Sequence, residues 1–136
     1  MQRTIPKLKK IKYIENPVTL GDKIKNRRLA LQLTQEQAGR QIGVTRETLW
    51  DWENHIAEPT IEFYPAIIEF LGFTPFVFDL STLGGKVKQY RYLHGLSQDG
   101  LSASLGIGGA TIMRVEHGIG QVSKATRKAL SGIMEV

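Results

Sequence analysis

Residues 34–54 read T-Q-E-Q-A-G-R-Q-I-G-V-T-R-E-T-L-W-D-W-E-N, and this pattern predicts two short helices joined by a tight turn. Ala38 and Ile42 stand four positions apart in the first helix, which places both on one face. Gly43 accepts the left-handed backbone that ends such a helix. Thr45 is a residue type that caps a following helix, which we expect over about residues 46–54.

The second of these helices has two different faces. At about 100° per residue, Leu49, Trp52 and Glu53 share one side. The opposite side carries polar or bulky groups, namely Arg46, Glu47, Trp50, Asp51 and Asn54. A helix of this kind, held by another helix that crosses behind it, is suited to presenting side chains in the major groove of DNA.

Three signals appear in order and at the right spacing along this part of the chain. Arg28 precedes Leu33-Thr34-Gln35, Ala38 precedes Gly43-Val44-Thr45, and Leu49 precedes Trp52-Glu53. Together they resemble the phage-repressor and Cro type of helix-turn-helix, also called the xenobiotic-response-element family. The resemblance covers residues 20–71. It implies an all-α, lambda-repressor-like fold and sequence-specific binding to double-stranded DNA.

The resemblance also assigns roles to individual residues. It implies a partly buried, structural ion pair between Arg28 and Glu53. Gln35 matches a position that contacts a phosphate from a helix N-terminus, and the alternative is a simple first-turn residue. His55 and Glu58 depart from the family, which usually has a glycine and a basic residue there. The implied DNA-binding set of this part is Gln35, Thr45, Arg46, Glu47, Thr48, Trp50, Asp51 and Asn54.

Base reading by the second helix has a specific chemical basis. An arginine such as Arg46 binds guanine O6 and N7 with two hydrogen bonds, and a glutamate such as Glu47 accepts from cytosine N4. The alternative is a solvated charged face. Trp50 either packs on a thymine methyl group or on a neighbouring helix, whereas we expect Trp52 in the core.

An internal repeat appears when the sequence is shifted by 63 positions. Residues 20–53 and 83–116 then share 10 identities without a gap. Arg91 and Glu116 repeat the predicted ion pair, and Gln98, Thr111 and Arg114 are the DNA-contact candidates of the second copy. Gly108, Gly109 and Ala110 replace Thr45, Arg46 and Glu47, so direct base reading is nearly absent from the second copy.

We therefore predict two tandem domains of four to five short helices each. The expected helices are about 20–32, 35–42, 46–54, 65–71, 83–94, 98–105, 109–117 and 124–134, the last capped by Ser123. The expected domains cover residues 20–72 and 83–136. Residues 73–82 form an apolar connector whose rings are expected to pack against both halves. Residues 1–19 are a basic arm, which either follows DNA, docks on the body or is a solvated tail.

Composition limits the other function classes. The chain of 136 residues has no cysteine, which excludes a disulfide scaffold and a thiolate metal site. Its three histidines lack metal-ligand spacing, and no nucleophile stands beside a base, so we predict no enzyme, metal or cofactor. No membrane span or signal peptide is expected, and the predicted compartment is the cytoplasm.

Charge is distributed unevenly along the chain. The formal net charge of +5 divides into +4 for residues 1–19, −3 for residues 20–82 and +4 for residues 83–136. A basic protein suits a polyanion partner. The sequence therefore favours a DNA-binding transcriptional regulator, acting as a homodimer or as a pseudo-dimer within one chain. The alternative is an antitoxin-type interaction module that binds a toxin protein and represses its own operon, because such proteins share this fold.

Overall fold

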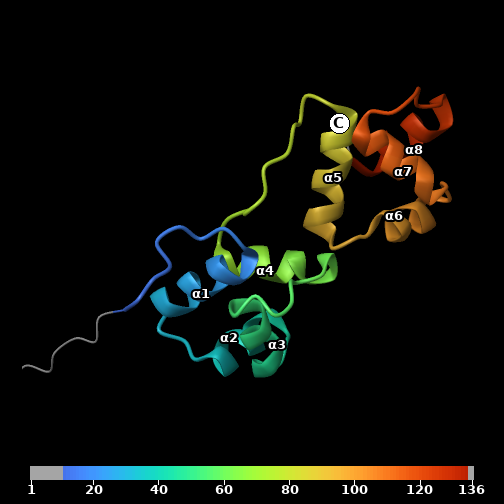
Figure 1. Ribbon diagram of the computed structural model, residues 1–136. Coiled ribbons are helices and arrows are strands. Elements are labelled where there is room, and N and C mark those ends of the chain that lie inside the picture. Colours follow the sequence, from blue (N-terminus) through green and yellow to red (C-terminus); the bar gives the residue numbers. More distant parts are fainter. Residues whose placement is uncertain (1–10, 135–136) are drawn as a thin grey trace, which may run out of the picture. The chain divides into compact units, whose positions relative to one another are not determined.

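The computed structural model describes residues 11–134, and every regular element in that part of the chain is helical (Figure 1). The all-α fold expected from the sequence is confirmed. The α-helices are α1 Leu20–Ala30, α2 Gln35–Ile42, α3 Arg46–Glu53, α4 Tyr64–Leu71, α5 Leu83–His94, α6 Gln98–Leu105, α7 Gly109–His117 and α8 Lys124–Met134, with a short 3-10 helix at Ile61–Phe63.

Local capping explains where these helices begin and end. The side-chain oxygens of Thr19, Thr45 and Ser123 each accept a hydrogen bond from a backbone N–H three residues later. Gly43 ends α2 in the left-handed conformation, with φ of 94°. Three expected bounds differ. Helix α3 ends at Glu53 and α4 begins at Tyr64, each one residue from the expectation. Helix α1 ends at Ala30 and does not reach Gln32, whose φ of 56° is incompatible with a continuing helix.

The chain divides into two compact units, of which unit 1 ends at Glu58 and unit 2 begins at Pro59. Helix α4 lies in unit 2, where it packs against α5. The boundary between the two units, after Glu58, lies earlier in the chain than the end of the first domain that the sequence suggests, at residue 72. The domain boundary at residue 72 stays a prediction.

In unit 1, α3 packs against both α1 and α2 (Figure 1). The approach of α1 to α3 is close at Gly21, where an added Cβ atom would overlap the Trp52 carbonyl group. A glycine is therefore required at this crossing. The buried apolar side chains of these three helices are Ile24, Ala38, Ile42, Leu49 and Trp52.

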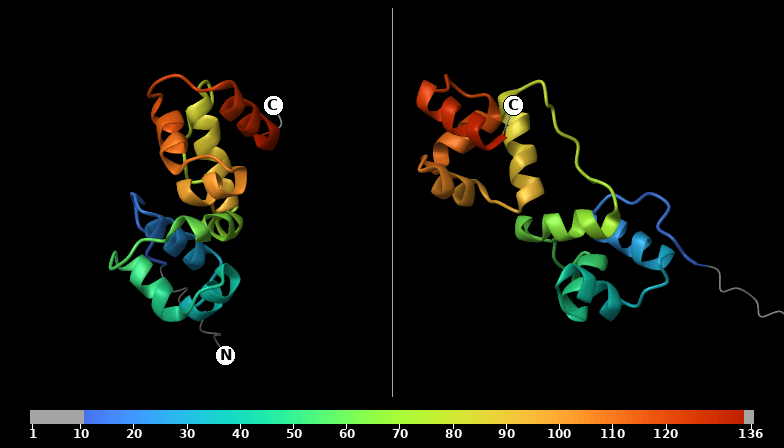
Figure 2. Two further views of the ribbon diagram at one scale, coloured as in Figure 1. Left: turned by 90° about the vertical axis from the view of Figure 1, so that its right-hand side faces the viewer. Right: turned by 180° about the vertical axis from the view of Figure 1, so that it is seen from behind.

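In unit 2, α7 packs against α5 and α6, and α8 packs against α5 (Figure 2). The crossing of α5 and α7 again occurs at a glycine, Gly84, which is the position equivalent to Gly21. One core cluster of this unit consists of Val87, Leu101, Ile112, Val115 and Leu130, and α4 adds the buried side chains Ile67, Phe70 and Leu71.

The connector behaves differently from the sequence expectation. Phe76 and Phe78 pack edge-on against Tyr92 of α5, with ring centroids 4.9 and 5.3 Å away. The ring of Phe73, which was also expected to pack, is exposed instead, and so are the apolar residues Val77 and Leu80. Val77 stands between Phe76 and Phe78, and in an extended segment alternate side chains point to opposite sides.

The expected basic arm lies partly outside the described residues, which begin at Ile11. Residues 11–14 have no helix and run beside α1. The Ile14 backbone N–H donates to Asn26 Oδ1 at 2.7 Å, and Asn26 Nδ2 donates to the Ile14 carbonyl at 2.9 Å. One asparagine thus fixes the end of the arm to the first helix.

Candidate nucleic-acid interface

The site candidates of unit 1 gather on α3 and on the beginning of α2. Helix α2 ends at Gly43, and the Thr45 side chain opens α3 by accepting from Thr48 N–H at 3.2 Å. The Thr45 hydroxyl also donates to the Thr48 hydroxyl at 3.0 Å. Both threonines therefore shape the start of α3 as well as lying beside its outward face.

The outward face of α3 is accessible to a partner. Arg46 and Glu47 are exposed, and within residues 11–134 neither side chain makes a hydrogen bond or an ion pair. Trp50 is half exposed, at 49%, and Asp51 is partly exposed. Asn54 is exposed, but its Nδ2 donates to the Trp50 carbonyl at 2.9 Å, so this side chain also closes the end of the helix.

The inward face of α3 is held by an ion pair. Arg28 of α1 donates two hydrogen bonds to the Glu53 carboxylate, at 2.9 and 2.7 Å, and a third to the Leu33 carbonyl at 3.1 Å. Gln35 Nε2 lies 3.3 Å from the same carboxylate. The bidentate geometry fixes the angle between α1 and α3. Gln35 thus has an internal partner that the sequence analysis does not foresee.

Unit 2 repeats this network bond for bond at positions 63 residues later. Arg91 donates to both Glu116 oxygens and to the Leu96 carbonyl, and Gln98 Nε2 lies 3.4 Å from Glu116 Oε1. Identical bonding at that spacing is what a structural repeat requires. The two arginine–glutamate pairs are the ones that the sequence analysis expects to meet.

A second contact in unit 1, between His55 and Asp22, was not predicted from the sequence. His55 follows α3 with φ of 61° and places Nε2 at 2.7 Å from Asp22 Oδ1, while Asp22 Oδ2 accepts from Val18 and Thr19 N–H. Burial alone would raise the pKa of the Asp22 carboxyl, but the hydrogen bonds from His55 and the two backbone groups outweigh it and lower that pKa. The sequence signal that could have indicated this contact is the histidine at residue 55, where the family usually has a glycine.

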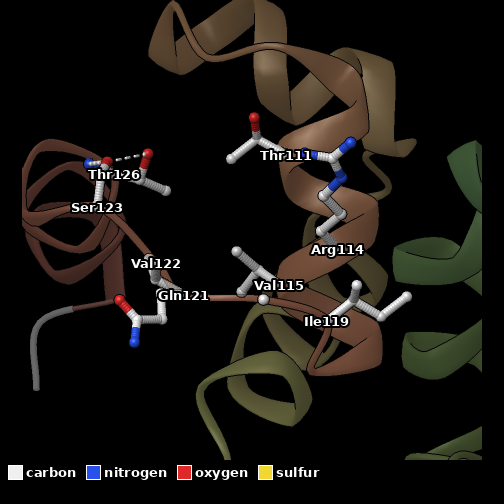
Figure 3. Close-up of a pocket in the computed structure, with 9 residues that line it drawn as sticks. Thr111, Arg114, Val115, Ile119, Gln121, Val122, Ser123 and Thr126 are labelled. Carbon is white, nitrogen blue, oxygen red and sulfur yellow. Dashed lines mark hydrogen bonds between the residues drawn. The ribbon is translucent and has the colours of Figure 1, made fainter.

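The corresponding face of unit 2 has different chemistry. Thr111 and Arg114 of α7 line one side of a pocket of about 430 Å³, and Ser123 and Thr126 at the start of α8 line the other (Figure 3). Because Gly108 replaces the capping threonine, no side-chain hydrogen bond within residues 11–134 engages the Thr111 hydroxyl. Arg114 is likewise exposed and without an ion pair in the described part of the chain.

The first turn of α7 is also unlike that of α3. It begins at Gly109, where an added Cβ atom would lie 2.7 Å from Asp99 Oδ1 of α6. A carboxylate therefore occupies the space beside Gly109, the position at which α3 carries Arg46. This arrangement does not offer base-reading donors at the start of α7.

Part of the chain matches a known protein family, over a range that runs from α1 through α4. Residues 24–78 match a family model described as helix-turn-helix. These residues form a helix-turn-helix domain. The match supports the family that the sequence resembles and indicates a DNA-binding helix-turn-helix regulator, and it does not extend over the second copy. No curated protein and no solved structure matches the chain.

Two further kinds of site are absent from the described part of the chain. Among residues 11–134, no group of three or more His, Asp or Glu side chains is arranged to hold a metal ion. None of the described helices has the length and apolar character needed to cross a membrane.

Proposed function

We propose that unit 1 of the helix-turn-helix protein regulates transcription by placing α3 in the major groove of duplex DNA. The supporting observation is the contrast between the two faces of α3. Its inward face is fixed by the Arg28–Glu53 pair, whereas Arg46 and Glu47 point outward without an internal partner in the described chain. A rigid helix with unengaged donor and acceptor groups suits direct readout of guanine and cytosine edges.

The two copies have unequal roles in this proposal. Unit 1 reads bases, and the second copy contacts mainly the phosphate backbone through Arg114, with Gln98 and Thr111 beside it. Support comes from the charge of +4 in residues 83–136 and from the small residues Gly108, Gly109 and Ala110 at the start of α7. Phosphate contacts carry affinity without sequence information.

Selection from random DNA duplexes, followed by titration of the selected duplex at several salt concentrations, tests DNA binding. With six to ten phosphate contacts, affinity should fall by about 10³–10⁵ between 50 and 200 mM salt. No selected motif, or an affinity that does not change with salt, would contradict the proposal.

The division of roles is tested by two matched arginine substitutions. Arg46→Ala should cost about 1–3 kcal/mol at one base position and relax the preference there, whereas Arg114→Ala should weaken all sequences alike and flatten the salt slope. If Arg114→Ala leaves DNA affinity unchanged and alters the oligomeric state, the second copy contacts protein instead.

A further inference from the structure

Unit 2 contains an open groove between α5 and the end of α8, at the edge of the core, where Tyr90 and Ile133 both line the groove and pack against the core cluster. Its volume is about 530 Å³, and its apolar lining includes Leu80, Tyr90, Leu93 and Ile133. Leu80 and Leu93 are 46% and 39% exposed. Gly132 lies in the wall formed by α8, and an added Cβ atom there would meet nothing within 4 Å.

Unit 1 shows how the same helix face is used in the first copy. Asn26 of α1 is the position equivalent to Gln89, which lines the groove in unit 2. In unit 1 the Asn26 amide forms a pair of hydrogen bonds with the backbone N–H and carbonyl of Ile14, at 2.7 and 2.9 Å. An extended segment of the chain thereby covers this face of α1.

The preceding segment of unit 2 does not cover the groove in the same way. The residue that corresponds to Ile14 is Val77, which is 100% exposed. Its neighbours Phe76 and Phe78 pack on Tyr92, which does not line the groove. Within residues 11–134, the Gln89 amide makes no hydrogen bond, so both its donor and its acceptor remain available.

We propose that this groove binds an extended segment of a partner protein. The Gln89 amide pairs with the N–H and the carbonyl of one residue of that segment, as Asn26 does with Ile14. Apolar side chains of the segment then fill the space between α5 and α8. The mode of recognition combines backbone hydrogen bonds for affinity with pockets for selected side chains.

Charge indicates which kind of segment fits. The basic side chains that line the groove are Lys86 and His94, and no carboxylate of the described residues lines it. A segment with acidic residues beside its apolar ones therefore complements the groove.

The test is a selection of peptides from a random ten-residue display library on the full-length protein, followed by fluorescence anisotropy with the selected peptides. We expect peptides that combine apolar residues with net negative charge. Gln89→Ala should weaken their binding about tenfold, because two backbone hydrogen bonds of ordinary strength are lost. Peptide binding by the groove does not depend on DNA binding by α3, so a variant that loses one of these activities can still be assayed for the other.

Substitutions that fill or charge the groove complete the test. Gly132→Phe should abolish peptide binding by occupying the groove, and Leu93→Glu should weaken binding by placing a negative charge among apolar walls that face an acidic segment. Ser131→Phe is the matched control, since Ser131 is the exposed neighbour of Gly132 on α8 and does not line the groove. Failure to select any peptide, or selected peptides that bind Gly132→Phe as well as the parent protein, would overturn the inference.

Discussion

At the scale of single residues, the Arg28–Glu53 pair determines how firmly α3 is held. The Glu53 side chain is 2% exposed and the Arg28 side chain 12%, so removal of either partner leaves a charge with little water around it. Arg28→Ala and Glu53→Ala should each cost about 3–5 kcal/mol of stability. Because the groups touch, the double variant should depart from additivity by about 0.5–3 kcal/mol in chemical denaturation. Additive effects would show that the bidentate contact does not contribute.

Asp22 links the start of α1 to the residue that follows α3, and its lowered pKa makes this link sensitive to acid. A carboxyl whose pKa is lower in the folded state stabilises the fold above its unfolded value, near 3.8, and loses that contribution as the pH falls through the lowered value. Asp22→Asn should therefore remove part of the loss of stability that the parent protein shows below about pH 4.

Urea denaturation over a range of pH, followed by circular dichroism, measures this effect. Glu36→Gln is the matched control, because Glu36 is exposed and pairs only with Arg40 on the helix surface. Equal acid sensitivity of Asp22→Asn and the parent protein would rule out the link between Asp22 and acid stability.

At the scale of helices, two glycines with opposite surroundings give a matched pair of predictions. Gly21→Ala should destabilise unit 1 by about 1–3 kcal/mol, because the new methyl group overlaps the Trp52 carbonyl. Gly132→Ala should stabilise α8 by up to about 1 kcal/mol, because alanine favours a helix and its Cβ meets nothing within 4 Å. Thermal unfolding measures both changes. A Gly21→Ala protein as stable as its parent would show that α1 and α3 are not in close contact.

The helices were predictable because their signals are local. Threonine and serine caps, glycine ends and apolar spacing all act within one or two turns, and α2, α5, α6, α7 and α8 have the bounds expected from them. Contacts between distant residues were harder to foresee. The ion pairs were foreseen through a resemblance, whereas the Asn26–Ile14 and Asp22–His55 contacts depend on side-chain directions that no short pattern specifies.

The candidate site was foreseen only in part, for a similar physical reason. Helical spacing correctly separates buried Trp52 from half-exposed Trp50. It does not reveal that Gln35 and Asn54 also have internal partners, Glu53 and the Trp50 carbonyl. The exposure of Phe73 was missed because apolar composition does not say which residues of a connecting segment meet the core.

At the scale of the whole molecule, the repeat predicts the stoichiometry of DNA binding. Dimeric helix-turn-helix proteins place two copies on half-sites about 34–36 Å apart. We propose that one chain supplies both copies, at least in part. Light scattering should then find one chain per selected duplex. A dimer in free solution that uses only one copy of each chain on DNA would contradict this expectation.

The two tryptophans of the chain, Trp50 and Trp52, stand two positions apart on opposite faces of α3, and unit 2 contains none. Tryptophan fluorescence therefore reports on unit 1 alone. An aqueous quencher such as iodide should reach the indole at residue 50 and spare the one at residue 52, which is 4% exposed. The fluorescence of Trp50 should therefore report whether a partner occupies the outward face of α3, and that of Trp52 whether the core behind α3 is intact.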